Sequence, residues 1–234
     1  VIMCSIYGSS NESMLEVLHA ATLFRGEYAF SLLTISNKNA IKVVKQKDHP
    51  TEINLCKNTK FALGHNQAPT SAQRAYHEMT SHPFRSNDWI IGHNGVITNY
   101  KELTEKYCKW NKSPVDSAVI PSLLNQFSVI PSVLNKFSTD DETLPEIENI
   151  SSVLSLLEGT FAVWILNEQS NSVYIARQGS TLFCNPKTGD FCSINSTSGN
   201  WIELIEGNIY KINLNTKKVK AVGKFANTTP YFTI

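Results

Sequence analysis

The sequence has 234 residues, 41% of them hydrophobic, and its 21 lysines and arginines nearly balance 20 aspartates and glutamates. This is enough for a sizeable core, and the neutral charge without a basic block argues against a nucleic-acid partner. The longest apolar runs fall far short of the roughly 20 residues that span a bilayer, so we expect a cytoplasmic protein with no membrane partner.

The first part of the chain predicts a strand, a helix and a hairpin. Residues 4–7 form a strand candidate, and Ser13 is expected to cap an amphipathic helix that runs to Phe24. Residues 28–35 and 40–44 flank a polar turn, which is typical of a β-hairpin. Residues 61–64 and 89–91 are expected to be short buried strands.

A Gly-His-Asn-Gly segment follows at 92–95. Asn-Gly is a strong turn dipeptide because both residues tolerate positive φ, so a sharp corner is expected here. At such a corner the Asn94 carboxamide and the Gly95 peptide N–H would be two donors aimed at one point, as in an oxyanion hole. The residues alone leave both interpretations open.

A tandem repeat of ten residues occupies 119–138, as VIPSLLNQFS followed by VIPSVLNKFS. It predicts two short helical turns, with Pro121 and Pro131 at their first positions. The acidic run at 139–149 is expected to be a solvated loop. Beyond it we predict a helix and three strands, at 151–157, 160–166, 173–177 and 209–214.

Strands at both ends of the chain with helices between them predict an α+β layered fold with largely antiparallel sheets. No segment has the composition of a linker, so residues 1–234 are expected to form a single domain. Five widely spaced cysteines include no C-x-x-C pair, and we expect reduced thiols.

Eight short motifs occur in the order found in the class-II glutamine amidotransferase domain, which this sequence resembles over nearly its whole length. They are Met-Cys at 3–4, RGEYA at 25–29, GHNQAPT at 64–70, HPF at 82–84, GHNGVITNY at 92–100, VDSAVI at 115–120, LEGTFAVWIL at 157–166 and IARQGSTL at 175–182. This family of N-terminal nucleophile hydrolases includes domains of asparagine synthetase, amidophosphoribosyltransferase, glutamate synthase and glucosamine-6-phosphate synthase. The resemblance implies a four-layer αββα sandwich that hydrolyses the glutamine side-chain amide to glutamate and ammonia.

The resemblance also implies roles for single residues. Cys4 corresponds to the nucleophile, and its own free α-amino group to the base. Asn94 and Gly95 correspond to the oxyanion donors, and Asp116 to the residue that binds the substrate α-ammonium group. The remaining substrate-binding positions are Arg25, Gln67, Thr70 and His93. From the residues alone, Cys4 could also be a small core residue and Asp116 a helix N-cap.

Several positions depart from the family pattern, including Ser5 in place of the glycine that follows the nucleophile and Ala118 in place of an acidic residue. Two departures bear most on activity. Gln67 stands where the family has an arginine that binds the substrate α-carboxylate, and Arg74 or Arg85 is a candidate replacement. Three residues precede Cys4, so an α-amino base requires a chain that begins at Cys4. We expect no cofactor and no metal, because the spacing of the histidines at 65, 77, 82 and 93 matches no ligand motif.

Three hypotheses about function remain open. The first is a stand-alone amidotransferase that uses glutamine and passes ammonia to a separate synthase. The second is a catalytically impaired fold that serves as a binding or assembly module, for example a virion-associated one, since free-standing versions of the domain occur in bacteriophages. The third is a cysteine amidohydrolase that acts on another amide.

Overall fold

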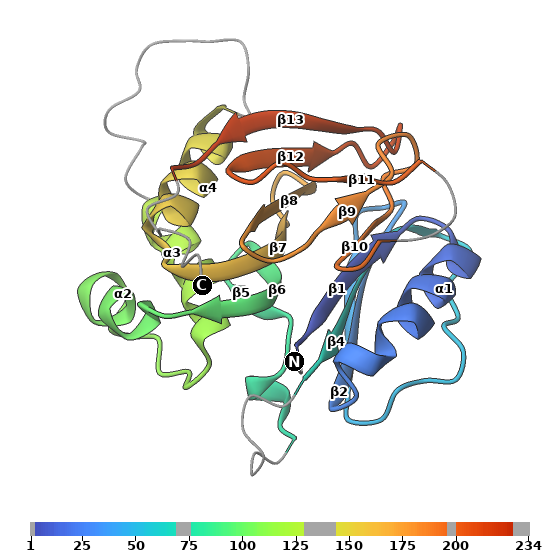
Figure 1. Ribbon diagram of the computed structural model, residues 1–234, viewed down its shortest axis with the longest axis horizontal. Coiled ribbons are helices and arrows are strands. Elements are labelled where there is room, and N and C mark those ends of the chain that lie inside the picture. Colours follow the sequence, from blue (N-terminus) through green and yellow to red (C-terminus); the bar gives the residue numbers. More distant parts are fainter. Residues whose placement is uncertain (1–2, 69–75, 129–143, 196–199, 227–234) are drawn as a thin grey trace, which may run out of the picture.

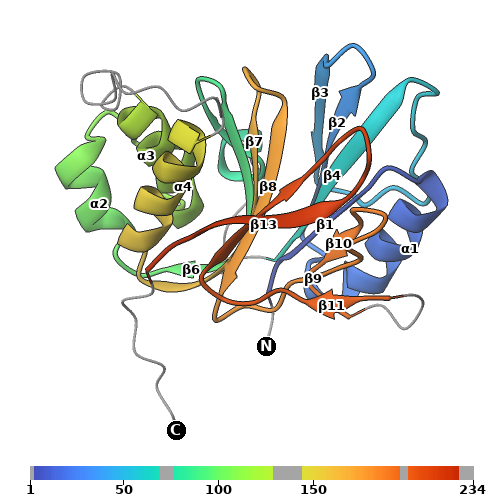
Figure 2. The same cartoon turned by 90° about the horizontal axis from the view of Figure 1, so that it is seen from above.

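Two antiparallel β-sheets stacked face to face form the centre of the protein (Figures 1 and 2). The structure is a computed structural model that describes residues 3–68, 76–128, 144–195 and 200–226. The helices are α1 (Glu12–Thr22), α2 (Tyr100–Tyr107), α3 (Val119–Ser128) and α4 (Leu144–Leu156), and the 3₁₀ turns are η1 (Leu23–Arg25), η2 (Glu78–Thr80) and η3 (Asp116–Ala118). None of these helices is both long and apolar enough to cross a membrane.

The first sheet has the strand order β11-β9-β10-β1-β4-β2-β3, and the second β13-β12-β8-β7-β6-β5. The strands of the first are β1 (Ser5–Ser9), β2 (Ala29–Ser36), β3 (Ile41–Gln46), β4 (Thr59–Gln67), β9 (Phe183–Cys184), β10 (Phe191–Cys192) and β11 (Ile202–Glu203). Those of the second are β5 (Phe84–Ser86), β6 (Trp89–Ile97), β7 (Gly159–Asn167), β8 (Ser172–Gln178), β12 (Asn208–Ile212) and β13 (Val219–Lys224).

Three apolar cores separate four layers. The central core lies between the sheets and includes Ile6, Phe61 and Trp164. A second core joins the outer face of the second sheet to the helices α3 and α4, and a third joins α1 to the outer face of the first sheet. Helices therefore cover both outer faces, as Figure 2 shows, and the predicted four-layer αββα sandwich is confirmed.

Several predicted elements occur with changed bounds. The expected hairpin is β2 and β3, paired from Phe30↔Gln46 to Ile35↔Ile41. Helix α1 begins one residue after Asn11, whose side chain accepts a hydrogen bond from the N–H of Met14, so the prediction of Ser13 as the cap was wrong. Asn11 is the N-cap because its backbone is extended and its carboxamide reaches the N–H of the third residue of the helix.

The corner expected at Asn94-Gly95 is absent, because both residues lie inside β6. The ladder to β7 runs without interruption from Trp89↔Asn167 to Ile97↔Gly159. Gly95 has φ +144°, a backbone conformation open mainly to glycine, and it serves an extended strand instead of a turn.

The acidic run was predicted to be a loop, yet its end from Leu144 onward is the first part of α4. Pro145 is accommodated in the first turn, where no N–H is needed, and Ile147, Ile150 and Val153 face the core. The first copy of the tandem repeat forms α3, which begins two residues before Pro121. The second copy, at 129–138, lies outside the described residues.

Candidate active site

Cys4 lies immediately before β1, at the edge of the central core. Its side chain is half-buried, and the peptide N–H of Ala68 donates to its Sγ at 3.4 Å. The pairing of Ser5 with Asn66 in the β1–β4 ladder brings the end of β4 beside Cys4. The candidate nucleophile therefore belongs to the first sheet and is held beside a backbone donor.

Asn94 belongs to the second sheet and reaches the first through Ser193. Its Nδ2 lies 3.4 Å from the Ser193 hydroxyl, which also accepts the N–H of Ile6 at 2.9 Å. Ile6 is two residues from Cys4 on β1, so one buried hydroxyl links the nucleophile strand to the candidate oxyanion residue. All three of Ile6, Asn94 and Ser193 have no exposed surface.

The free edge of β6 presents a row of peptide groups. The N–H of Thr98 donates to Glu158 at 2.9 Å and that of Glu168 donates to Asp88 at 2.8 Å. Because hydrogen-bonded pairs alternate along an antiparallel ladder, the even-numbered residues of β6 bond to β7. His93, Gly95 and Ile97 therefore turn their peptide groups to the opposite edge, which β5 covers only at 89–91.

Asp116 reaches the same edge. Its Oδ2 accepts the N–H of Ile97 at 2.8 Å, and its other oxygen lies 3.4 Å from the Ser117 hydroxyl. Val115 occupies the N-cap position of the 3₁₀ turn, and its side chain makes no capping hydrogen bond. Asp116 is the first residue of the turn and is therefore not an N-cap. The half-buried carboxylate lies two residues along the edge from Gly95.

Two buried histidines lie behind this edge and are neutral at pH 7. Burial lowers the pKa of His65 to about 3. Burial also lowers the pKa of His93, although the nearby Asp116 carboxylate opposes this. The Nδ1 of His93 lies 2.7 Å from the Ser117 hydroxyl, and the Nε2 of His65 lies 2.9 Å from the His93 carbonyl oxygen.

Gln67 is buried and bonded at both ends of its carboxamide. Its Oε1 accepts the N–H of His82 at 3.2 Å, and its Nε2 donates to the Thr80 carbonyl at 3.4 Å. Lys45 fixes the same segment by donating to the Ser81 carbonyl at 2.8 Å. In this structure the Gln67 side chain fastens the segment 80–82 and does not extend toward the Cys4 thiol as a free polar group.

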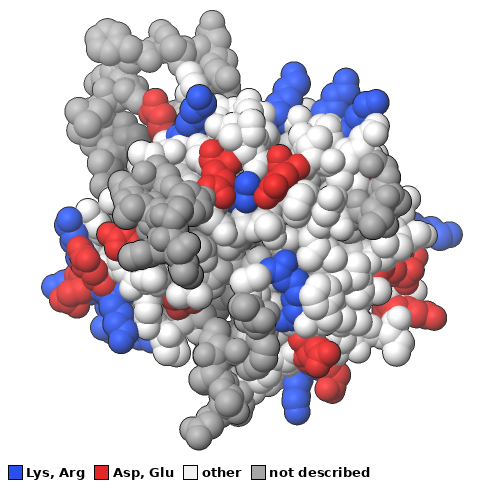
Figure 3. Space-filling model, viewed as in Figure 1, with Lys and Arg blue, Asp and Glu red and all other residues white. Residues whose placement is uncertain are grey.

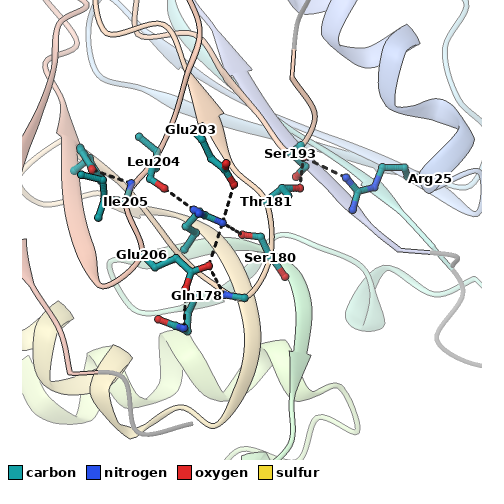
Figure 4. A network of polar contacts seen from close by, with 12 residues as sticks. Arg25, Gln178, Ser180, Thr181, Ser193, Glu203, Leu204, Ile205 and Glu206 are labelled. Carbon is teal, nitrogen blue, oxygen red and sulfur yellow. Dashed lines mark hydrogen bonds and ion pairs between the residues drawn. The ribbon is translucent and has the colours of Figure 1, made fainter. Parts of the chain in front are cut away.

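Arg25 lies on the 3₁₀ turn η1 and is 9% exposed. Its guanidinium donates to the Ser193 carbonyl at 3.2 Å (Figure 4). It also contacts the Met3 sulfur at 3.9 Å. Burial lowers its pKa, and negative charge on Cys192 or Cys4 opposes this shift.

The Ser193 carbonyl also accepts a hydrogen bond from the Thr181 hydroxyl, at 2.6 Å (Figure 4). The neighbouring loop is fixed by Arg177, which pairs with Glu203 at 3.0 Å and Glu206 at 3.2 Å. Ser193 is thus held in place by hydrogen bonds from Arg25 and Thr181.

On the face shown in Figure 3, acidic and basic side chains are interspersed around mostly uncharged surface.

The remaining predicted site residues lie elsewhere. Thr70 and Arg74 fall outside the described residues. Arg85 is on β5, where it forms an ion pair with Glu168 and donates to the Asn87 carbonyl at 2.9 Å. Both contacts are at the Trp89 end of β6, far along the strand from Asn94, so Arg85 is not placed to replace an arginine at position 67.

The fold is that of an N-terminal nucleophile amidotransferase domain of class II. Residues 72–198, more than half of the chain, match the family model described as a glutamine amidotransferase domain. The chain therefore belongs to the glutamine amidotransferase domain family.

This chain matches only part of the length of its curated relatives. A 7-cyano-7-deazaguanine synthase 2 of Sulfurisphaera tokodaii is 27% identical over 129 residues, which cover 52% of this chain and 28% of the relative. A glutamine--fructose-6-phosphate aminotransferase of Listeria innocua is 30% identical over 137 residues, or 54% of this chain and 22% of the relative. The chain thus spans less than a third of these relatives.

Solved structures agree on the fold. The allosteric regulatory enzyme of purine biosynthesis superposes with a TM-score of 0.67 at 17% identity, over 96% of this chain and 49% of that one. A glutamine aminotransferase class-II domain protein of Silicibacter pomeroyi superposes with a TM-score of 0.53 at 13% identity, over 96% of this chain and the whole of that one. At these identities the likeness concerns the fold alone.

Proposed function

We propose that this protein hydrolyses the side-chain amide of glutamine through a cysteine nucleophile. The observation that carries the proposal is the free edge of β6, where the alternation of the ladder turns the Gly95 N–H toward the side that Asp116 also occupies. The Asn94 carboxamide lies beside it, linked through Ser193 to the strand that follows Cys4.

The chemistry balances with water as the second substrate. The Cys4 sulfur attacks the amide carbon while its proton passes to the base, and the carbonyl oxygen becomes an oxyanion that accepts hydrogen bonds from Asn94 and Gly95. The tetrahedral intermediate collapses to a thioester, and the leaving nitrogen takes the proton and departs as ammonia. Water then hydrolyses the thioester, which gives glutamate and restores the thiol.

The base in this proposal is the α-amino group of Cys4. Its ordinary pKa of roughly 7.7 to 8 leaves a useful neutral fraction near pH 7, whereas a peptide nitrogen is not basic. The active form is therefore a chain that begins at Cys4. Loss of Met3 would also remove the sulfur that contacts the Arg25 guanidinium, so that this guanidinium would be more accessible to a bound ligand.

We assign the substrate ammonium group to Asp116, whose carboxylate keeps lone pairs beyond the one bonded to Ile97. His93, Thr70 and Arg25 complete the proposed substrate site. Because the Gln67 amide is engaged with the segment 80–82, the α-carboxylate needs another partner. Arg25 is a buried cation whose pKa burial lowers, and it lies close enough to Cys4 for charge on that sulfur to oppose this shift.

The test is glutamate release from glutamine by a chain that begins at Cys4, compared with the same chain carrying Cys4→Ser and with the form that begins at Val1. We expect turnover in the first protein alone. Equal turnover in the Cys4→Ser protein would exclude the proposed nucleophile, and strong Cys4-dependent turnover by the Val1 form would exclude the α-amino base.

A second candidate function rests on Gln67, since a site without the family arginine is also what a binding or assembly module would retain. On that proposal the residues 1–234 act as a single domain that holds a partner, and Cys4→Ser leaves its biological role intact. If the enzyme is active, the released ammonia has a separate synthase as its acceptor.

A further inference from the structure

His65 connects the two sheets directly behind the candidate oxyanion residues. It lies on β4, is 1% exposed, and its Nε2 is 2.9 Å from the carbonyl oxygen of His93 on β6. A carbonyl oxygen only accepts hydrogen bonds, so the Nε2 atom carries the proton and the ring is the Nε2–H tautomer. With a pKa of about 3, the ring stays neutral, and this tautomer is maintained, throughout the physiological range.

The carbonyl that His65 contacts takes no part in the ladder to β7. The alternation along β6 places His93 among the residues whose peptide groups face the free edge, and β5 ends at the partner of Ile91. The His93 carbonyl belongs to the same peptide unit as the Asn94 nitrogen, whose N–H bonds to β7, so His65 holds the second side of this unit. Fixing this unit fixes the backbone from which the Asn94 side chain and the Gly95 peptide extend.

The free edge is therefore held at two points on either side of Gly95. His65 holds the carbonyl of His93, and Asp116 holds the N–H of Ile97 at 2.8 Å. Between these two points the Gly95 N–H faces the same edge. The strand can present this donor at a fixed position because its neighbours on both sides are bonded.

We propose that His65 is a positioning residue, which holds Asn94 and Gly95 in the geometry that stabilises an oxyanion. This inference rests on the proposed glutamine hydrolysis. His65 acts through the backbone of β6 and does not touch the substrate. Because oxyanion donors act in the transition state, loss of the contact lowers kcat and leaves KM nearly unchanged.

Two substitutions separate the hydrogen bond from the imidazole. Glutamine places an N–H near the position of the histidine Nε2, whereas the shorter asparagine does not reach it. We expect His65→Gln to keep kcat within about threefold and His65→Asn to lower it about tenfold to a hundredfold, as misplaced catalytic groups do. His19→Asn is the matched control, since His19 is a buried histidine on the α1 side of the first sheet.

A double-mutant cycle identifies the residue through which His65 acts. In an Asn94→Ala background, His65→Asn should lower the remaining kcat by a smaller factor than it does in the wild type, because one of the two donors that it positions is already gone. Full additivity, or a loss in His65→Gln equal to that in His65→Asn, would overturn the proposal. A rise in KM without a change in kcat would do so as well.

A readout without turnover keeps this inference separate from the proposed function. Amide hydrogen exchange of the segment 92–97 should be faster in His65→Asn than in the wild type and in His65→Gln, with the ladder residues of β7 unchanged. Equal exchange in all three proteins overturns the positioning role, even if glutamine is the substrate. Absent turnover in a chain that begins at Cys4 overturns the proposed function, while the exchange result still decides whether His65 fixes β6.

Discussion

The substitution Gly95→Ala tests how tightly β6 and β7 constrain the candidate oxyanion site. Gly95 has φ +144°, and a Cβ added there would lie 2.7 Å from the carbonyl carbon and closer still to the carbonyl oxygen of Thr160, with the Phe161 Cα at 2.9 Å. All three distances are below the 3.0 Å that real Cβ atoms respect, and all three atoms are backbone. No side-chain rotation can relieve the contact, so the ladder must open.

The expected loss of stability has two parts. A residue with a side chain in such a backbone conformation costs about 1 to 3 kcal/mol, and overpacking against fixed neighbours costs about 1 to 3 kcal/mol more. We therefore expect Gly95→Ala to lower the free energy of unfolding by at least about 2 kcal/mol. With a urea slope of about 2 to 3 kcal/mol/M for a chain of this size, the unfolding midpoint should fall by at least about 0.7 M.

Gly207→Ala is the control that separates conformation from collision. Gly207 also has a positive φ, +75°, but among the described residues its added Cβ would meet only the Phe225 carbonyl oxygen, at an ordinary 3.4 Å. Its cost should be about 1 to 2 kcal/mol, that of a left-handed residue alone. A Gly95→Ala midpoint no lower than that of Gly207→Ala would refute the reasoning and mean that the strand yields locally.

Three further predictions concern the linked polar groups. Ser193→Ala leaves the buried N–H of Ile6 without its acceptor, and urea unfolding should register a loss of about 1 to 3 kcal/mol. Asp116→Asn keeps an acceptor for the Ile97 N–H but removes the charge, so KM for glutamine should rise about tenfold to a hundredfold with little change in kcat; an unaltered KM contradicts the assignment. Because the pKa of His65 falls from its ordinary 6.5 to about 3 on folding, the unfolded chain binds more protons between these values, and stability decreases as pH falls; from pH 7 to pH 5 the wild type should lose about 2 kcal/mol more than His65→Gln.

The sequence predicted the layers of the fold because its apolar segments have the lengths and periods of strands and amphipathic helices. The hairpin β2–β3 and the strands β7 and β8 follow this rule. The rule fails where a polar segment becomes ordered through tertiary contacts. Helix α2 was not predicted because half of its residues are charged, and Leu103 is the buried residue that anchors it.

The site was harder to predict than the fold, since a motif names residue types but not the direction of their groups. Asn-Gly indicated a turn at 94–95, and only the ladder reveals that positive φ can serve a strand. Gln67 was identified as a substitution for the family arginine, but its bonds to the segment 80–82 depend on long-range packing. Ser193 lies in no recognised motif, and no local pattern marks the hydroxyl that joins β1 to Asn94.

Cys4 precedes a strand of one sheet and Asn94 lies on a strand of the other, with the core of Ile6, Phe61 and Trp164 between the sheets. The thickness of that core therefore sets the separation between the attacking sulfur and the donors for the oxygen it charges. A larger side chain in this core would push the two sheets apart, and a smaller one would let them approach, so the distance between Cys4 and Asn94 would change. The rate of turnover should therefore respond to changes in apolar packing that are too small to lower the melting temperature, and it can be used to detect changes in the spacing between the sheets.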